Sequence, residues 1–248
     1  MNNYRRKCII IFLWAGLSLF PMLKASASEK EELEEILRFD SEQTQAIEDN
    51  EIANVQTAVD NLIKKYRVFL RKYPKNVDAR NYLGGLYYDF GKPEKAFQEW
   101  STGLTLNPQN PYLHNNIAEY YGHNSGEPKL AIKETKEAIR LKSDVAIFHF
   151  NLATYYDVFR FVALPEFESM ESVFEECLQE YRKAIELDPA NFEYAYTYAR
   201  TLTYSPKFWK IKDAYPVSKK IKAWKHCLSL APDKQQEVLI EKEIKKLK

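Results

Sequence analysis

The chain has 248 residues, and its 36 Lys and Arg against 35 Asp and Glu give a formal net charge of +1. This balance argues against a nucleic-acid-binding or membrane-surface protein, because such proteins usually carry an excess of basic residues. Only 7 residues are Gly, so the tight turns needed by a sandwich of many short strands are scarce. The hydrophobic share of 45% and the charged share of 29% fit a folded, helix-rich chain rather than a disordered one.

Residues 1–27 have the layout of a secretory signal peptide. Basic residues at Arg5–Lys7 precede an apolar run over Cys8–Leu23, and Ala25 and Ala27 provide the small residues that a signal peptidase requires. The alternative is an uncleaved membrane anchor, although the run is short for a span, which needs about 20 apolar residues. We predict export to the periplasm or the medium, with membrane contact only through the signal if it is retained. Removal of the segment would take away four basic residues and no acidic one, which leaves an acidic chain.

Residues 28–76 are predicted to form an N-terminal helical region that caps the following repeats. Its last part carries apolar side chains three and four residues apart, a spacing typical of one helix face. We interpret this stripe as the packing face of a capping helix. The alternative is a coiled-coil dimer contact, because the spacing averages 3.5 residues. The stripe consists of Ile52, Val55, Val59, Leu62, Tyr66, Phe69 and Tyr73.

Several sequence markers then recur in one frame. One is a small residue followed three positions later by a large one, with spacings of 34, 35 and 46 residues between successive copies. Another is a second small residue five positions before a closing Pro or Ser. A small residue on one helix lets a second helix approach closely, and a Pro after the second helix ends it. Such helix pairs complete their cores only by stacking on neighbouring pairs. The small residues are Gly84, Ala118, Ala153 and Ala199 in the first position, and Gly103, Ala138, Ala184 and Cys227 in the second.

The first copy resembles the tetratricopeptide repeat, with Arg80 where that pattern often has Trp. The resemblance implies an all-α fold, a right-handed superhelical stack of antiparallel helix pairs known as an α-solenoid. Repeat 2 has a one-residue insertion near Gly126, repeats 3 and 4 have longer ones, and in repeat 4 Lys220 occupies a position that is usually Ala. The motif reads Arg80-x-x-Leu83-Gly84-x-x-Tyr87, then Ala96, Trp100 and Pro108. The predicted units are repeat 1 at 77–110, repeat 2 at 111–145, repeat 3 at 146–191, degenerate repeat 4 at 192–234 and a C-terminal capping helix at 235–248.

Cys177 and Cys227 fall at helix positions that the repeat usually fills with Ala. A thiol behaves there as a small hydrophobic side chain, so we predict two buried free cysteines. The alternative is a disulfide between them, which an exported protein could form. The two positions lie in different repeats, and bridging requires Cα atoms within about 7 Å of each other.

The sequence contains no pattern typical of an active site, so we predict no enzyme activity, no metal and no cofactor. None of the four histidines is paired at the i, i+4 spacing of a helical zinc site, and no cysteine pair has ligand spacing. A glycine-rich phosphate loop and a nucleophile elbow are likewise absent from the sequence. A lysine cluster near Trp224 could contact nucleic acid, but we predict no nucleic-acid partner for an exported acidic protein. The cluster comprises Lys219, Lys220, Lys222 and Lys225.

In the family that the repeats resemble, the first helices of successive pairs line a concave groove that binds peptides or protein segments. By this resemblance we expect the groove to be lined by first-helix side chains that packing does not use. Amides both donate to and accept from a peptide backbone, and aromatic rings offer rigid contact area. Some of these rings could instead be half-buried packing residues. The candidates are Asn81, Tyr82, Tyr88, Asn115, Asn116, Glu119, Phe150, Asn151, Thr154, Asp157, Tyr196 and Arg200.

The two long insertions, within 159–176 and 205–218, are rich in aromatic residues. These aromatics could form a second contact surface or could cover the helices. After the last repeat, Asp233 is expected to cap a helix over Lys234–Leu247. We predict an exported, non-catalytic scaffold or adaptor that binds a protein or peptide segment. The alternative is a cell-envelope assembly or secretion accessory factor that works with a membrane complex.

Overall fold

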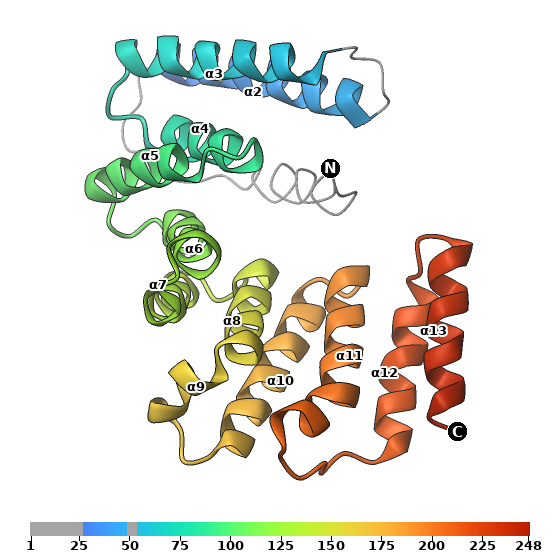
Figure 1. Ribbon diagram of the computed structural model, residues 1–248. Helices are drawn as coiled ribbons and strands as arrows, with labels where there is room; N and C mark the ends of the chain where they lie inside the picture. The colour runs from blue at the N-terminus through green and yellow to red at the C-terminus, as the bar shows by residue number, and fades with distance from the viewer. Residues whose placement is uncertain (1–26, 49–53) are drawn as a thin grey trace. The chain divides into compact units, whose positions relative to one another are not determined.

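The computed structural model describes residues 27–48 and 54–248 (Figure 1). Within these ranges there are twelve α-helices and no strand, so the all-α expectation is confirmed. The chain divides after Asn116 into two compact units, which are described separately. The predicted signal lies outside the described residues, except that Ala27 is the first residue of the first described helix. None of the described helices is long and apolar enough to cross a membrane.

The first unit is built from helical hairpins. It contains α2 (Ala27–Glu48), α3 (Val55–Lys72), α4 (Val77–Asp89), α5 (Pro93–Leu106) and the beginning of α6 (Pro111–Tyr120). Asn side chains start α3 and α4: Asn54 accepts from the backbone N–H of Thr57, and Asn76 from that of Ala79. Such N-caps satisfy amides that have no partner inside the helix. The local sequence therefore determines where α3 and α4 begin.

The middle of the apolar stripe is buried inside the first unit, where α3 packs against α2 and α4. Val55 and Tyr73 at its ends are half-buried, and Ile52 lies outside the described residues. Tyr66, in the middle of the stripe, donates a hydrogen bond of 2.8 Å to the buried carboxylate of Asp40 on α2. Burial raises the pKa of Asp40, and the hydrogen bond from Tyr66 opposes this shift. Because α2 and α4 already cover the middle of the stripe, its buried side chains are not available for a coiled-coil dimer.

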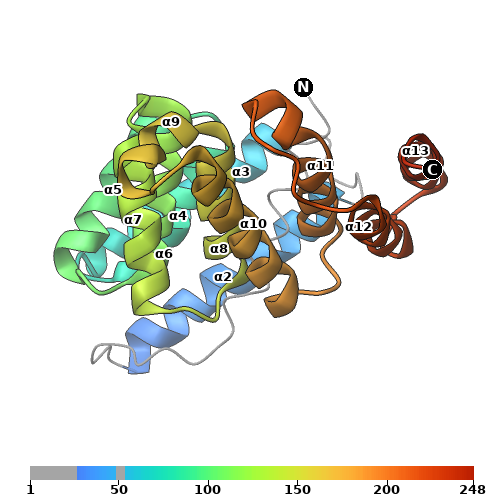
Figure 2. The ribbon, with the colours of Figure 1, turned by 90° about the horizontal axis from the view of Figure 1, so that it is seen from below.

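The second unit continues from the end of α6 through a stack of helices. It contains α7 (Pro128–Leu141), α8 (Ala146–Val158), α9 (Arg160–Ala163), α10 (Met170–Leu187), α11 (Phe192–Trp209), α12 (Val217–Ser229) and α13 (Lys234–Lys246). From α8 onward the long helices lie side by side in chain order, and each packs on the next (Figure 1). Figure 2 shows α12 and α13 nearly end-on beside α11.

The one-residue insertion near Gly126 forms a turn of π-helix at Tyr121–Ser125. A π-turn accommodates one extra residue without ending the helix. Gly126 closes it with φ +71°, a left-handed conformation that glycine adopts without strain.

Two buried clusters form the core of the second unit. The larger one surrounds α8 and α10 and includes Ala153 and Cys177, and the smaller one joins α11, α12 and α13 and includes Ala199 and Cys227. Both thiols are buried and unpaired in the part of the chain that the structure describes, so the predicted free cysteines are confirmed. Asp233 caps α13 by accepting from the backbone N–H of Gln236 at 2.8 Å, as expected.

Candidate functional site

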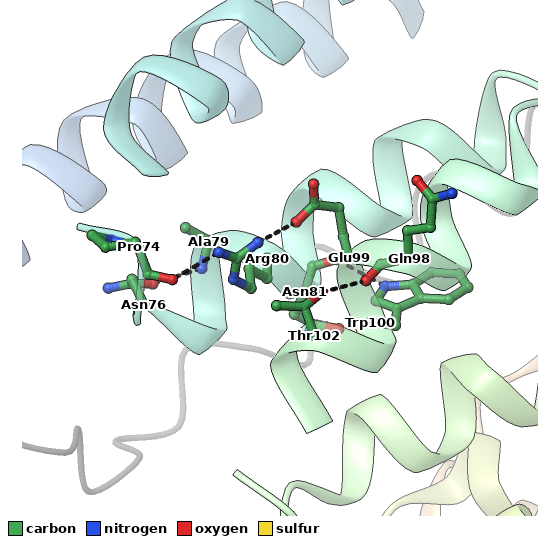
Figure 3. A network of polar contacts seen from close by, with 9 residues as sticks. All are labelled: Pro74, Asn76, Ala79, Arg80, Asn81, Gln98, Glu99, Trp100 and Thr102. Atoms are coloured by element: carbon green, nitrogen blue, oxygen red, sulfur yellow. Dashed lines mark hydrogen bonds and ion pairs between the residues drawn. The ribbon is translucent and has the colours of Figure 1, made fainter. Parts of the chain in front are cut away.

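The contact between α4 and α5 depends on Gly84, because glycine has no Cβ atom. A Cβ atom there would lie 2.2 Å from Nε1 of Trp100, which real Cβ atoms essentially never do. The indole therefore fills the space above Gly84, and its Nε1 donates to the backbone carbonyl of Asn81 at 3.2 Å (Figure 3). Tyr88 packs a tilted ring against Trp100, with the ring centroids 5.5 Å apart. The small-and-large pattern of the sequence is thus a direct packing contact.

Arg80, which stands where the repeat often has Trp, joins the pair to the preceding turn. Its guanidinium donates to Glu99 of α5 at 2.6 Å and to the backbone carbonyl of Pro74 at 2.7 Å. Figure 3 shows it lying between these two groups, close to the end of α4 that Asn76 caps. Arg80 and Glu99 are mostly buried, so the ion pair is partly shielded from water.

Two histidines repeat this link at the same position of later pairs. Nε2 of His114 lies 3.0 Å from the carbonyl of Pro108, and Nε2 of His149 lies 2.9 Å from that of Ser143. As with Arg80, the partner carbonyl is six residues earlier in the chain. From the sequence, these histidines were considered only as metal ligands. Their regular spacing from the small residues could have revealed the linking role.

His149 also has a partner on the second helix of its pair. Its Nδ1 lies 2.5 Å from the carboxylate of Glu180 on α10, and both side chains are largely buried. Burial alone would lower the pKa of His149. The hydrogen bonds with Glu180 and the Ser143 carbonyl outweigh burial and raise this pKa above its usual value. His149 is therefore a titratable version of the Arg80 link.

The predicted groove residues of the first unit mainly join helices to one another. Asn116 is buried and donates to the side-chain oxygen of Asn81 at 2.7 Å, and Asn115 is also buried. Tyr82 is half-buried and stacks on Tyr66 with a centroid distance of 6.3 Å. The structure thus brings Asn81 and Asn116 together in a contact between α4 and α6. A role in ligand binding for these residues stays a prediction.

In the second unit, several predicted groove residues form polar bridges between the first helices of successive pairs. Asn151 of α8 donates to Glu119 of α6 at 3.1 Å. Asp157 of α8 accepts from Thr201 at 3.1 Å and from Ser205 at 3.2 Å, both on α11. These bridges align α6, α8 and α11 along one face of the unit.

The same face extends to α13. Tyr204 of α11 donates a hydrogen bond to Glu243 of α13, which adds another bridge between first helices. Tyr204 was not among the residues predicted to line the groove. It lies four and eight residues after Arg200 and Tyr196, so helical spacing could have found it. We call the exposed side of α8, α11 and α13 along these bridges the first-helix face.

The remaining candidates divide into packing residues and one exposed cation. Phe150 packs against Tyr181 and Tyr194, with centroids 5.6 and 4.6 Å away, and Thr154 donates to the carbonyl of Phe150 at 2.9 Å. Tyr196 packs edge-on against Trp224 of α12 at 5.6 Å. Arg200 alone among the twelve candidates is exposed.

Arg200 forms no ion pair within residues 27–48 and 54–248. Its positive charge lowers the pKa of the buried Tyr181, although burial, the dominant influence, raises that pKa. A bound carboxylate could therefore pair with Arg200 without displacing an internal partner.

The aromatic insertions are of two kinds. Phe167 packs edge-on against Tyr156 at 5.5 Å, and Trp209 packs edge-on against Phe174 at 5.2 Å, so both rings cover the core of the unit. Phe161 and Phe208, in contrast, are exposed. No group of three or more His, Cys, Asp or Glu side chains in the described ranges could hold a metal ion.

No protein-family model matches the chain, and no curated protein matches it. Several solved structures, in contrast, match the chain. PilW, described as a widely conserved type IV pilus biogenesis factor, matches with a TM-score of 0.66 at 12% identity, over 90% of this chain and 87% of its own. YrrB, described as a TPR protein with an unusual peptide-binding site, matches with a TM-score of 0.51 at 15% identity, over 88% of this chain and 100% of its own. MamA from Desulfovibrio magneticus RS-1 matches with a TM-score of 0.53 at 12% identity, over 79% of this chain and 94% of its own.

These similarities show the fold. Together with the paired helices and the small-and-large contacts, they establish that the chain has the all-α tetratricopeptide-repeat fold of stacked antiparallel helix pairs. The fold predicted from the sequence is therefore confirmed.

Proposed function

We propose that the protein is a non-catalytic adaptor that binds a protein segment on the first-helix face of its second unit. The fold supports this proposal, since YrrB shares it and is described as having a peptide-binding site. The observation that carries the proposal is the unpaired, exposed guanidinium of Arg200 beside the polar bridges of that face.

The chemistry of the face suits a segment that carries a carboxylate. Tyr196, Arg200 and Tyr204 lie four residues apart on α11 and therefore share one side of the helix. Tyrosine and arginine are the residue types that most often dominate the energy of protein interfaces. Arg200 would pair with an acidic side chain of the partner, while the flanking tyrosines would contact its apolar part.

Site-specific photo-crosslinking in cells tests the proposal. A photoreactive amino acid at position 200 should capture a defined protein, whereas the same residue in place of Lys133 should not. Lys133 is an exposed, unpaired residue of α7, which belongs to the second helices of the pairs. Arg200→Glu should abolish capture from a photoreactive residue at position 204, and Lys133→Glu should leave it intact. Equal capture from positions 200 and 133 would overturn the assignment to this face.

We also propose that the protein acts outside the cytoplasm, on the basis of the signal-like pattern of residues 1–27. Intact-mass analysis of the protein from fractionated cells should show a chain that begins at Ser28 in the soluble exported fraction. An unprocessed chain in the membrane fraction would instead favour the anchored alternative.

The alternative function, an accessory factor in envelope assembly or secretion, rests on the same pattern together with the fold shared with PilW, which is described as a pilus biogenesis factor. The identity of the protein crosslinked at position 200 separates the two functions. A component of a membrane complex would support the alternative, and a soluble exported protein would support the adaptor.

A further inference from the structure

The two most exposed of the large apolar side chains in the described ranges come from different insertions. Phe208 near the end of α11 is 71% exposed, and Phe161 on α9 is 69% exposed. The next in rank, Val158, is 59% exposed and lies three residues before Phe161. Large apolar side chains that gather on a surface mark sites of contact with another protein or a membrane. The exposed rings of Phe161 and Phe208 therefore differ from the packed rings of Phe167 and Trp209 in the same insertions.

Arg160 brings the two insertions together. Its guanidinium carbon lies 4.7 Å from the ring centroid of Phe161, 5.0 Å from that of Phe208 and 5.4 Å from that of Trp209. Cation–π contacts at these distances hold the exposed rings around one positive charge. Nε of Arg160 and Nε1 of Trp209 are buried and have no hydrogen-bond partner in the part of the chain that is described.

The surroundings of these rings are basic. Lys207, Lys210 and Lys212 flank Phe208 and are all exposed, and none of them forms an ion pair among the described residues. Arg160 likewise has no carboxylate partner there. No acidic residue lies in α9 or between Lys207 and Lys212, so this local basic surplus is not visible in the net charge of the whole chain.

Two acidic residues of the insertions are neutralised by ion pairs. Glu166 pairs with Lys136, and Asp213 pairs with the buried Lys220. Glu168, Glu171, Glu175 and Glu176 of the first insertion form no ion pair in the described ranges, but none of them lies in α9 or between Lys207 and Lys212. Four unpaired cations thus lie in the two short segments that carry the protruding aromatic rings.

We propose that this aromatic–basic edge, formed by Arg160, Phe161, Lys207, Phe208, Lys210 and Lys212, binds the surface of an anionic lipid bilayer. Aromatic rings at the headgroup boundary bury apolar area, and lysine and arginine beside them attract anionic lipids. A lipid phosphate would also pair with the Arg160 guanidinium, which has no carboxylate partner in the described ranges.

A bilayer explains the geometry better than a protein segment does. The rings protrude at the ends of helices, where a fluid bilayer can take them up while its anionic headgroups pair with the neighbouring cations. The edge shares no residue with the first-helix face. Membrane contact is therefore a second activity, independent of the proposed partner binding.

The test uses the full-length chain with Cys8→Ser, so that an introduced cysteine is the reactive one, since Cys177 and Cys227 are buried. An environment-sensitive nitrobenzoxadiazole label is attached at Phe208→Cys or, as a matched control, at Leu239→Cys, an exposed position on α13. The apolar N-terminal segment can attach every variant to vesicles. The emission of the label, rather than vesicle binding, therefore reports contact at the edge.

Vesicles of phosphatidylcholine with phosphatidylglycerol should shift the emission of the label at position 208 to the blue, and pure phosphatidylcholine should do so much less. The label at position 239 should respond to neither. Adding Lys207→Glu and Lys212→Glu should weaken the response by about tenfold in lipid concentration. The same two changes at the exposed residues Lys242 and Lys245 should leave it unchanged. Equal responses at positions 208 and 239, or a response at 208 that ignores anionic lipid, would overturn the proposal.

Discussion

The α4–α5 pair of the first unit and the α11–α12 pair of the second place a tryptophan at the same position but hold it differently. Trp100 and Trp224 each follow the small residue of the first helix, Gly84 or Ala199, and each is almost completely buried. In α4–α5 the indole N–H donates to the backbone carbonyl of Asn81. In α11–α12 it donates to the side-chain hydroxyl of Thr203 at 3.0 Å.

The aromatic ring that packs on the indole and the group that accepts from the indole N–H exchange places before and after the small residue. Tyr88 packs on Trp100 from four residues after Gly84, and Tyr196 packs on Trp224 from three residues before Ala199. A buried indole needs one acceptor and close packing, and either flank of the small residue can supply each. The small residue and the tryptophan are therefore the constant part of the contact, while the neighbouring side chains vary.

The largest expected effect comes from removing the tryptophans. Trp100→Ala and Trp224→Ala should each lower the free energy of unfolding by about 4 kcal/mol, because each leaves a cavity at the centre of a pair. Urea unfolding followed by far-UV circular dichroism measures this loss. If the two pairs are equivalent, the two losses should agree within about 1 kcal/mol. A loss confined to Trp100 would show that the pair with the insertion no longer depends on this contact.

Gly84 gives the next largest effect. Gly84→Ala should destabilise the chain by about 3 kcal/mol, because the new Cβ would overlap the indole of Trp100. Gly85→Ala is the matched control: a Cβ there meets nothing within 4 Å. It should therefore stabilise the helix by about 0.5–1 kcal/mol. Thermal unfolding of the two variants beside the parent measures the contrast.

A second-site change sharpens this result. Trp100→Phe removes the part of the side chain that occupies the space above Gly84, so Gly84→Ala should cost less in the Trp100→Phe background than alone. Simple additivity of the two changes would contradict direct contact as the cause.

The repeat frame could be predicted because its positions depend on side-chain size. Gly84, Ala153 and Ala199 mark close approaches between helices, and these approaches tolerate few residue types. The same frame predicted the burial of Cys177 and Cys227 without a disulfide. Stacking fixes such positions wherever the repeat occurs, so the pattern identified the resemblance, and the resemblance implied the fold.

The candidate site was harder to predict, because polar side chains on the first helices have two possible uses. Asn116 and Asp157 looked like ligand-binding residues, yet they bond to side chains of neighbouring first helices. Whether an amide or a carboxylate faces a neighbour or solvent depends on how far adjacent helices are apart, which the spacing of residues does not specify. Arg200 was identifiable because a long cation is seldom buried without a partner.

The position that links a helix pair to the preceding turn carries a permanent charge in one pair and a titratable charge in another. Arg80 holds Glu99 in the α4–α5 pair, His149 holds Glu180 in the α8–α10 pair, and the α11–α12 pair has Ala195 at this position. Since the pKa of His149 is raised in the folded state, its stabilising effect is complete below its unfolded pKa of about 6.5. The effect is lost as the pH rises through the higher folded-state pKa.

Glu180→Gln should therefore cost about 2 kcal/mol at low pH, where His149 is charged, and less at alkaline pH. Glu99→Gln should cost a similar amount at both pH values, because arginine stays charged throughout. Unfolding free energies of the parent and both variants on either side of the transition measure the difference. A pH-independent loss in Glu180→Gln would contradict the assignment of the charge to His149.

The smallest effect concerns the alanine position that the last pair fills with a lysine. Ala96 occupies it in α5 without any exposed surface, whereas in α12 the side chain of Lys220 is 7% exposed and its ammonium pairs with Asp213 from the insertion. Because Asp213 is itself 46% exposed, water weakens the pair, so Asp213→Asn should cost only about 1 kcal/mol.

Lys220→Met keeps the buried part of the side chain and removes the charge, so stability should change by less than about 0.5 kcal/mol. In that background Asp213→Asn should have no further effect, since the carboxylate no longer has an ammonium to neutralise. Chemical unfolding of the two single variants and the double variant completes this cycle. If Asp213→Asn remained costly without Lys220, the insertion would stabilise the last pair through its own structure, and the lysine would be an incidental replacement for alanine.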